Sequence, residues 1–150
     1  MTFEEYLIQL KKGSNYSRFK KAILNQELLY ALTGKAPYDS NAYEWLKVSP
    51  SIVIPLLHLF ISEGQLTNTE INEAFRQIEI KSKEDVWLLM LYVEAALLYK
   101  KNRETPLVEL DIDYQINKIN EVWEVYKDDY TVKKYTEDIY KITENPIFGV

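Results

Sequence analysis

The residue types that most often carry enzyme chemistry are nearly absent from this chain. It contains one histidine, His58, and no cysteine among its 150 residues. A thiol nucleophile, a thiolate metal site and a zinc site built from cysteine and histidine are therefore excluded. Only four glycines occur, and none forms a glycine-rich phosphate-binding loop. We therefore expect no bound metal and no cofactor. The residue types present favour a binding function over catalysis.

Glu94 is the only charged side chain in the apolar run 86–99. A buried carboxylate is unfavourable unless it is paired or protonated. We expect Glu94 to be buried and satisfied by a tyrosine hydroxyl or a basic side chain. The alternative is a small all-α enzyme that uses Glu94 as its functional acid. His58 has no second histidine with which to share a metal, and we expect it at the edge of the core with a hydrogen bond.

Asp111 and Asp113 place two carboxylates two residues apart. On a strand they would share a face and could hold Mg²⁺ or Ca²⁺, or serve the enzyme alternative. At the start of a helix they would cap it and interact favourably with its dipole. The apolar and polar residues of 107–114 alternate, which is compatible with a strand or with an extended lead-in to a helix.

The segment 11–21 is basic and contains no acid. Aromatic residues are interleaved with its cations, an arrangement that could bind phosphates and stack on bases. The chain as a whole is acidic, with a net charge of −5, so we expect an ordinary solvated face and keep a nucleic-acid module as an alternative. The residues concerned are Lys11, Lys12, Tyr16, Arg18, Phe19, Lys20 and Lys21.

The acidity is concentrated in the last third of the chain. Residues 106–150 hold ten acidic and five basic side chains, whereas residues 1–60 hold five and seven. Exposed tyrosines among carboxylates suit recognition of a basic protein, because tyrosine gives rigid contact area and the acids steer association. We predict a partner-binding region made of Glu121, Glu124, Asp128, Asp129, Tyr130, Glu137, Asp138 and Tyr140.

Hydrophobic periodicity and capping residues predict one all-α domain over residues 1–150, a compact bundle of about six to eight helices. Thr2, Thr67 and Thr131 are the expected N-caps of three of them, and Ser49 with Pro50 opens another. Pro55 implies either an irregular lead-in or a bend in that helix. The expected helices span about 2–12, 17–33, 41–47, 50–63, 68–78, 83–101, 111–126 and 132–144.

These features favour a non-enzymatic protein-binding domain. Its sharpest form is an immunity or antitoxin-like protein that masks a basic partner such as a toxin. The lack of cysteine suits a reducing compartment, and the longest apolar run is shorter than the roughly 18 residues typical of a membrane span. We therefore expect a cytoplasmic protein that binds neither membrane nor nucleic acid.

Overall fold

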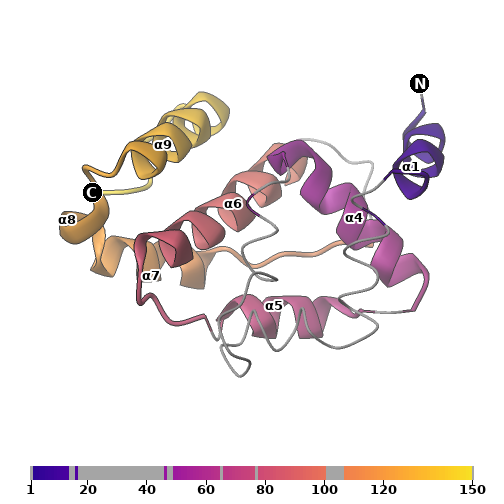
Figure 1. Cartoon of the computed structure of the whole chain (residues 1–150), viewed down its shortest axis with the longest axis horizontal. Coiled ribbons are helices and arrows are strands. Elements are labelled where there is room, and N and C mark those ends of the chain that lie inside the picture. The colour runs from indigo at the N-terminus through magenta and orange to yellow at the C-terminus, as the bar shows by residue number, and fades with distance from the viewer. Residues whose placement is uncertain are drawn as a thin grey trace.

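The computed structural model describes residues 2–13, 16, 46, 49–64, 66–76, 78–100 and 107–149. These residues contain seven α-helices and no strand, so the all-α prediction is confirmed (Figure 1). The predicted helices at 17–33 and 41–47 lie outside the described residues, apart from Leu46. The helices are α1 (Phe3–Lys11), α4 (Pro50–Ser62), α5 (Asn68–Arg76), α6 (Lys83–Lys100), α7 (Asp113–Glu121), α8 (Trp123–Tyr126) and α9 (Tyr130–Thr143).

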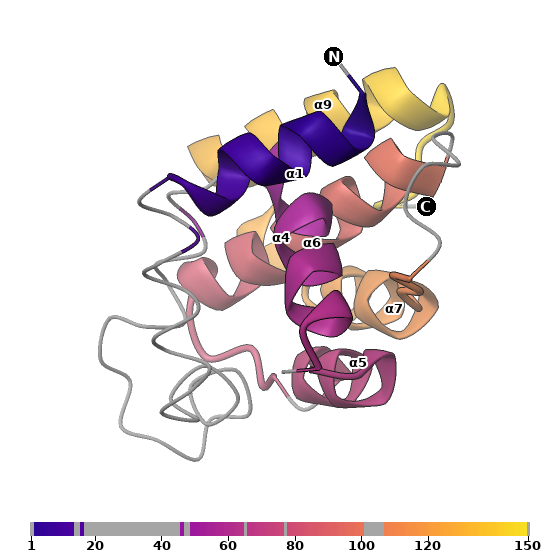
Figure 2. The same ribbon diagram turned by 90° about the vertical axis from the view of Figure 1, so that its right-hand side faces the viewer.

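Helix α6 forms the centre of the fold. It packs against α4, α7 and α9, and its residues from Asp85 to Ala95 are buried except Trp87 (Figure 1). A helix that is apolar on every side requires such neighbours. Helix α1 packs on the outside of α4, as Figure 2 shows, and α5 packs against α7. Within the described residues, no helix is both long enough and apolar enough to cross a membrane.

Two of the three predicted threonine caps are confirmed. The Thr2 hydroxyl accepts a hydrogen bond from the Glu5 amide at 3.1 Å. The Thr67 hydroxyl accepts from the Glu70 amide at 3.1 Å, and the Glu70 carboxylate accepts from the Thr67 amide at 3.2 Å. The prediction for Thr131 is wrong, because α9 begins at Tyr130 and its N-cap is Asp129.

Pro55 lies inside α4, which is continuous from Pro50, and this rules out the first of the two alternatives, an irregular lead-in. Proline has no amide hydrogen, and the Ser51 carbonyl therefore lacks its helical donor. The Tyr99 hydroxyl, from the end of α6, donates to that carbonyl at 3.0 Å. A side chain of the central helix thus supplies the hydrogen bond that proline removes from its neighbour.

Residues 107–112 are an extended lead-in to α7 and do not pair with a strand. Two asparagines of α5, one helical turn apart, bind their backbone. The Asn68 side chain bonds the Leu107 carbonyl at 2.6 Å and the Glu109 amide at 2.9 Å. The Asn72 side chain bonds the Glu109 carbonyl at 2.8 Å and the Asp111 amide at 2.9 Å. The alternate residues pack on the core, namely Val108, Leu110 and Ile112.

The helix predicted over 111–126 is divided in two. Val122 leaves the helical range, with φ −112° and ψ 12°, and this turn places the Trp123 ring stacked on Phe148 at 5.7 Å. The C-terminal tail is held beside the turn, where the Gly149 amide donates to the Asn120 side chain at 2.8 Å. Gly149 has φ +74°, and a Cβ there would lie 2.4 Å from Nε1 of Trp123, so only glycine fits.

We predict that Asn72→Ala lowers the free energy of unfolding by on the order of 2–3 kcal/mol. The change removes two bonds to the extended segment and leaves the hydroxyl of buried Tyr92, which donates to Asn72 at 2.6 Å, without that acceptor. Urea denaturation measures the effect. Thr69→Ala, at an exposed position of the same helix, is the control. Equal losses in the two variants would show that the asparagine contacts contribute no special stability.

Candidate functional site

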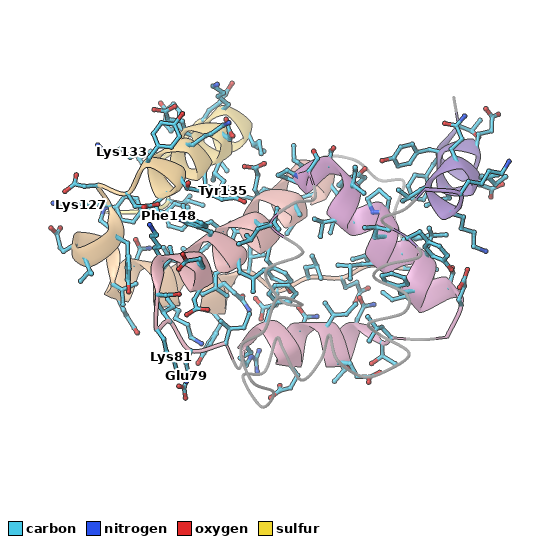
Figure 3. All side chains as sticks on the ribbon, viewed as in Figure 1. Glu79, Lys81, Lys127, Lys133, Tyr135 and Phe148 are labelled. Atoms are coloured by element: carbon cyan, nitrogen blue, oxygen red, sulfur yellow. The ribbon has the colours of Figure 1, made fainter. Side chains whose placement is uncertain are left out.

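A cavity of about 390 Å³ lies where α9 meets α6 and the start of α4. We call it the Glu94 cavity. Glu94 comes from α6, Pro50 opens α4, and the other polar lining residues all belong to α9. Figure 3 shows Tyr135 on the side of α9 that faces α6. The lining consists of Leu46, Pro50, Glu94, Tyr130, Thr131, Lys134, Tyr135 and Asp138.

Glu94 is 6% exposed, so the prediction of a buried carboxylate is confirmed. The expectation that a neighbour satisfies it is wrong for Oε1, which is buried and has no hydrogen-bond partner in the described part of the chain. Burial raises the pKa of Glu94 to about 7, and the nearby Asp138 carboxylate adds to the rise. Glu94 therefore changes its charge in the physiological pH range.

The α9 wall of the cavity carries a tyrosine and a second carboxylate. Burial raises the pKa of Tyr135 to about 12, and the negative charges of Glu94 and Asp138 contribute to the rise. Asp138 is partly buried and lies 3.9 Å from the Lys141 ammonium. The local charge around Glu94 and Tyr135 is therefore negative.

The outward face of α9 is a stripe made of Tyr130, Lys133, Glu137 and Tyr140. These residues recur at intervals of three or four and are all exposed. Tyr130 also lines the Glu94 cavity. Tyr140 and Glu137 line a second, mostly apolar groove of about 370 Å³ between α9 and the C-terminal tail. The outer stripe therefore has a hollow on each side, and an exposed tyrosine borders each hollow.

Some of the remaining residues of the predicted partner-binding region are bonded within the fold, whereas others are exposed to solvent. Asp129 is the N-cap of α9, accepting a hydrogen bond from the Val132 amide at 3.1 Å and another from the Trp87 indole at 2.7 Å. Its role in the fold is structural. Glu124 pairs with Lys127 at 2.7 Å on the surface. Both Glu121 and Asp128 are exposed.

His58 lies where α4 meets α1. Its ring lies edge-on to Phe3 of α1 at 5.2 Å between centroids. Nδ1 is buried and has no hydrogen-bond partner within the described residues, so the expected hydrogen bond is not found there. Burial lowers the pKa of His58, which keeps the ring neutral at pH 7.

Asp111 and Asp113 are engaged in starting α7. The Asp113 amide donates to Oδ1 of Asp111 at 3.2 Å, and Oδ2 of Asp111 lies 3.6 Å from the Arg76 guanidinium. In the described ranges, no group of three or more His, Cys, Asp or Glu side chains is placed to hold a metal ion. The pair therefore stabilises a helix start.

Of the basic segment 11–21, the structure describes Lys11, Lys12 and Tyr16 among the residues of interest. Lys11 forms an ion pair with Glu63 of α4 at 2.7 Å, and Lys12 is exposed. Tyr16, which would stack on bases in the nucleic-acid alternative, is buried and stacks on Phe60 at 5.7 Å. Its ring is therefore unavailable to a nucleic acid. Outside the described residues lie Arg18, Phe19, Lys20 and Lys21.

Of the lining residues, sequence reasoning missed Leu46, Pro50 and three residues of α9, and for those three a signal was present. Thr131, Lys134 and Tyr135 are spaced with Asp138 at intervals that place all four on one flank of a helix. The spacing could not predict that Glu94 of α6 lies opposite these residues. The sequence separates Glu94 from Asp138 by 44 positions, and only the packing of α9 on α6 brings them to one cavity.

We predict that Glu94→Gln stabilises the protein in a pH-dependent way. A carboxyl group can have a higher pKa in the native protein than in the unfolded chain. At a pH below the unfolded-state pKa, such a group leaves the stability intact. As the pH rises through the native-state pKa, its ionisation opposes folding. For Glu94 this window runs from 4.5 to about 7. The variant should therefore gain on the order of 2–3 kcal/mol at pH 8, with most of that gain gone at pH 5. Urea denaturation across this range tests it, with Glu137→Gln as the exposed control. A gain that is equal at both pH values, or a loss at pH 8, would contradict a buried and destabilising charge.

The candidate site is thus an outward stripe of α9 that borders an acidic cavity on one side and an apolar groove on the other. Neither a protein-family model, nor a curated protein, nor a solved structure matches this chain.

Proposed function

We propose that the chain is a non-enzymatic protein-binding domain and that a basic partner docks on its C-terminal face. This face consists of the outer stripe of α9 together with α8 and the exposed acid Asp128. One observation carries the proposal. Val125, at 75% exposed, and Tyr130, at 80%, are the two most exposed large apolar side chains in the described residues. Tyr140 is 51% exposed on the same face.

The face combines the two components that protein recognition needs. Tyrosines that become desolvated at an interface usually supply much of the binding energy, whereas charges at the rim mainly raise the association rate. Here Tyr130 and Tyr140 stand beside Glu137, with Asp128 and Glu124 nearby in the sequence. The apolar groove next to Tyr140 offers a pocket for a side chain of the partner.

The acidity of this region indicates the kind of partner. Ten acidic against five basic residues over 106–150 would attract a positively charged surface. A basic toxin such as a nuclease has such a surface, and the chain would then act as an immunity or antitoxin-like protein. A regulatory adaptor for another basic protein fits the same chemistry.

A second candidate function rests on Glu94. A carboxyl group with a pKa of about 7 in a cavity beside another carboxylate has the properties of a general acid or base. The other lining residues give this candidate less support. Tyr135, with its pKa at about 12, does not give up a proton readily at neutral pH, and no histidine lines the cavity. Binding therefore remains the first candidate.

A photo-crosslinking experiment identifies the partner and its contact face together. p-Benzoylphenylalanine replaces Tyr140 in one sample and Tyr6 of α1 in another, because α1 lies at the opposite end of the molecule (Figure 1). We expect a basic protein to crosslink through position 140 and not through position 6. Crosslinking of the same protein through position 6 alone would overturn the proposed face.

With the purified partner, Tyr140→Ala should weaken binding by on the order of 1–3 kcal/mol, mainly through faster dissociation. Asp128→Lys should slow association and flatten its dependence on salt. Stopped-flow rates at two ionic strengths measure both effects. Tyr114→Ala on α7 and Glu4→Lys on α1 are the matched controls. Losses in the controls and none in the two test variants would contradict the proposal. Asp129 is unsuitable for this test because it caps α9.

A further inference from the structure

The Glu94 cavity contains a feature that the proposed function does not by itself explain. A carboxylate oxygen that is buried and without a hydrogen bond is unfavourable in a folded protein. Oε1 of Glu94 is in that state within the described residues, and Glu94 lines an open cavity. A group that enters the cavity and donates hydrogen bonds would remove the penalty.

We propose that the Glu94 cavity is a binding site for one guanidinium group, presented as an arginine side chain by the partner protein. Glu94 and Asp138 would accept its hydrogen bonds, and the rings of Tyr130 and Tyr135 would form the walls. The proposal rests on the proposed function, since it names what the basic partner inserts beside the outer stripe of α9.

The charge of the cavity fits a cation. Glu94 and Asp138 contribute two carboxylates, and the negative charge of Asp138 already raises the pKa of Glu94. Lys134, the one basic lining residue among those described, is exposed and forms no ion pair with either carboxylate, whereas the exposed Lys141 lies 3.9 Å from Asp138. A cation that enters would therefore relieve the repulsion between two like charges.

The shape and chemistry of the lining favour an organic cation over a metal ion. Mg²⁺ and Ca²⁺ need about six or more oxygen ligands, and no third acidic side chain joins the two in the described part of the chain. A guanidinium presents five donors in one plane, matches two carboxylates and also stacks on aromatic rings. A volume of about 390 Å³ lies within the range of roughly 300–1,000 Å³ typical of ligand pockets.

The position of the cavity fits delivery by a docked protein. Tyr130 belongs both to the cavity lining and to the outer stripe of α9. A partner seated on that stripe would therefore lie beside the cavity, where a side chain can be presented to it. The exposed tyrosines would hold the partner while Glu94 and Asp138 select the side chain.

The probe for the test is Nα-acetyl-arginine methylamide, titrated into the full-length protein and followed by amide chemical shifts. The neutral isostere Nα-acetyl-citrulline methylamide is the control ligand. We expect saturable shifts near Glu94, Tyr135 and Asp138 with the arginine compound and none with citrulline. Glu94→Gln should weaken the binding at least tenfold. Glu4→Gln, which removes the same charge from an exposed position of α1, should leave it unchanged.

The pH dependence gives a second readout. Among the described residues, the ionisable groups that line the cavity with Glu94 are Tyr130, Lys134, Tyr135 and Asp138, all from α9, and Lys141 lies 3.9 Å from Asp138. Between pH 8 and pH 6 Glu94 takes up a proton, and the affinity for the arginine compound should fall by about tenfold. In Glu94→Gln this fall should disappear.

Three outcomes would overturn the arginine site. These are equal binding of the arginine and citrulline compounds, equal weakening by Glu94→Gln and Glu4→Gln, or no saturable shift up to the solubility limit of the probe. The proposed function fails separately, if Tyr140→Ala and Asp128→Lys leave partner binding intact. If those two variants weaken partner binding while Glu94→Gln changes neither partner affinity nor the arginine shifts, the face stands and the arginine site does not.

Discussion

Helix α6 has to be covered on every side, because nearly all of its side chains from Asp85 to Ala95 are buried. This requirement fixes most of the architecture. Helices α4, α7 and α9 occupy its flanks, while α1 packs on α4 and α5 packs on α7. Even the proline in α4 is accommodated through α6, since Tyr99 supplies the donor that Pro55 lacks. The other helices are arranged by the need to remove one apolar cylinder from water.

Glu94 is the exception within that cylinder. Two other polar groups are buried in the described core, and one of them, Asp85, is fully used in opening α6, where it accepts from the Lys81 and Ser82 amides. Glu94 is placed in the same helix without such partners, next to a cavity and facing a second carboxylate. Groups that lower stability in this way are frequent where a protein binds or reacts. Glu94 is therefore both a buried residue of the central helix and the acid that lines the cavity.

The sequence predicted the helix class and most helix starts because these depend on local chemistry. A threonine three positions before a glutamate, or a serine before a proline, determines a helix start without reference to the rest of the chain. Thr131 was the wrong cap because the better acceptor, Asp129, also bonds Trp87 from α6, which is a tertiary contact. The division at Val122 likewise depends on the docking of the tail residue Phe148 on Trp123.

The candidate site was predictable only in parts. Glu94 and Asp138 were each selected from the sequence, one as an anomaly in an apolar run and the other as part of an acidic region. Nothing local indicates that they share a cavity, since the contact depends on how α9 lies across α6. The charge of Asp129 was counted as surface for the same reason, because its bond to Trp87 spans 42 positions.

The extended segment 107–112 has the alternating pattern of a strand, but it lies in a protein whose described part contains no sheet. Such a segment is a template on which another chain can add itself by backbone pairing. Asn68 and Asn72 occupy the backbone groups of its odd-numbered residues that a second strand would use. That edge of the segment is therefore closed to backbone pairing for as long as α5 is in place. Two asparagines on one helix occupy it with the side-chain equivalent of a neighbouring strand.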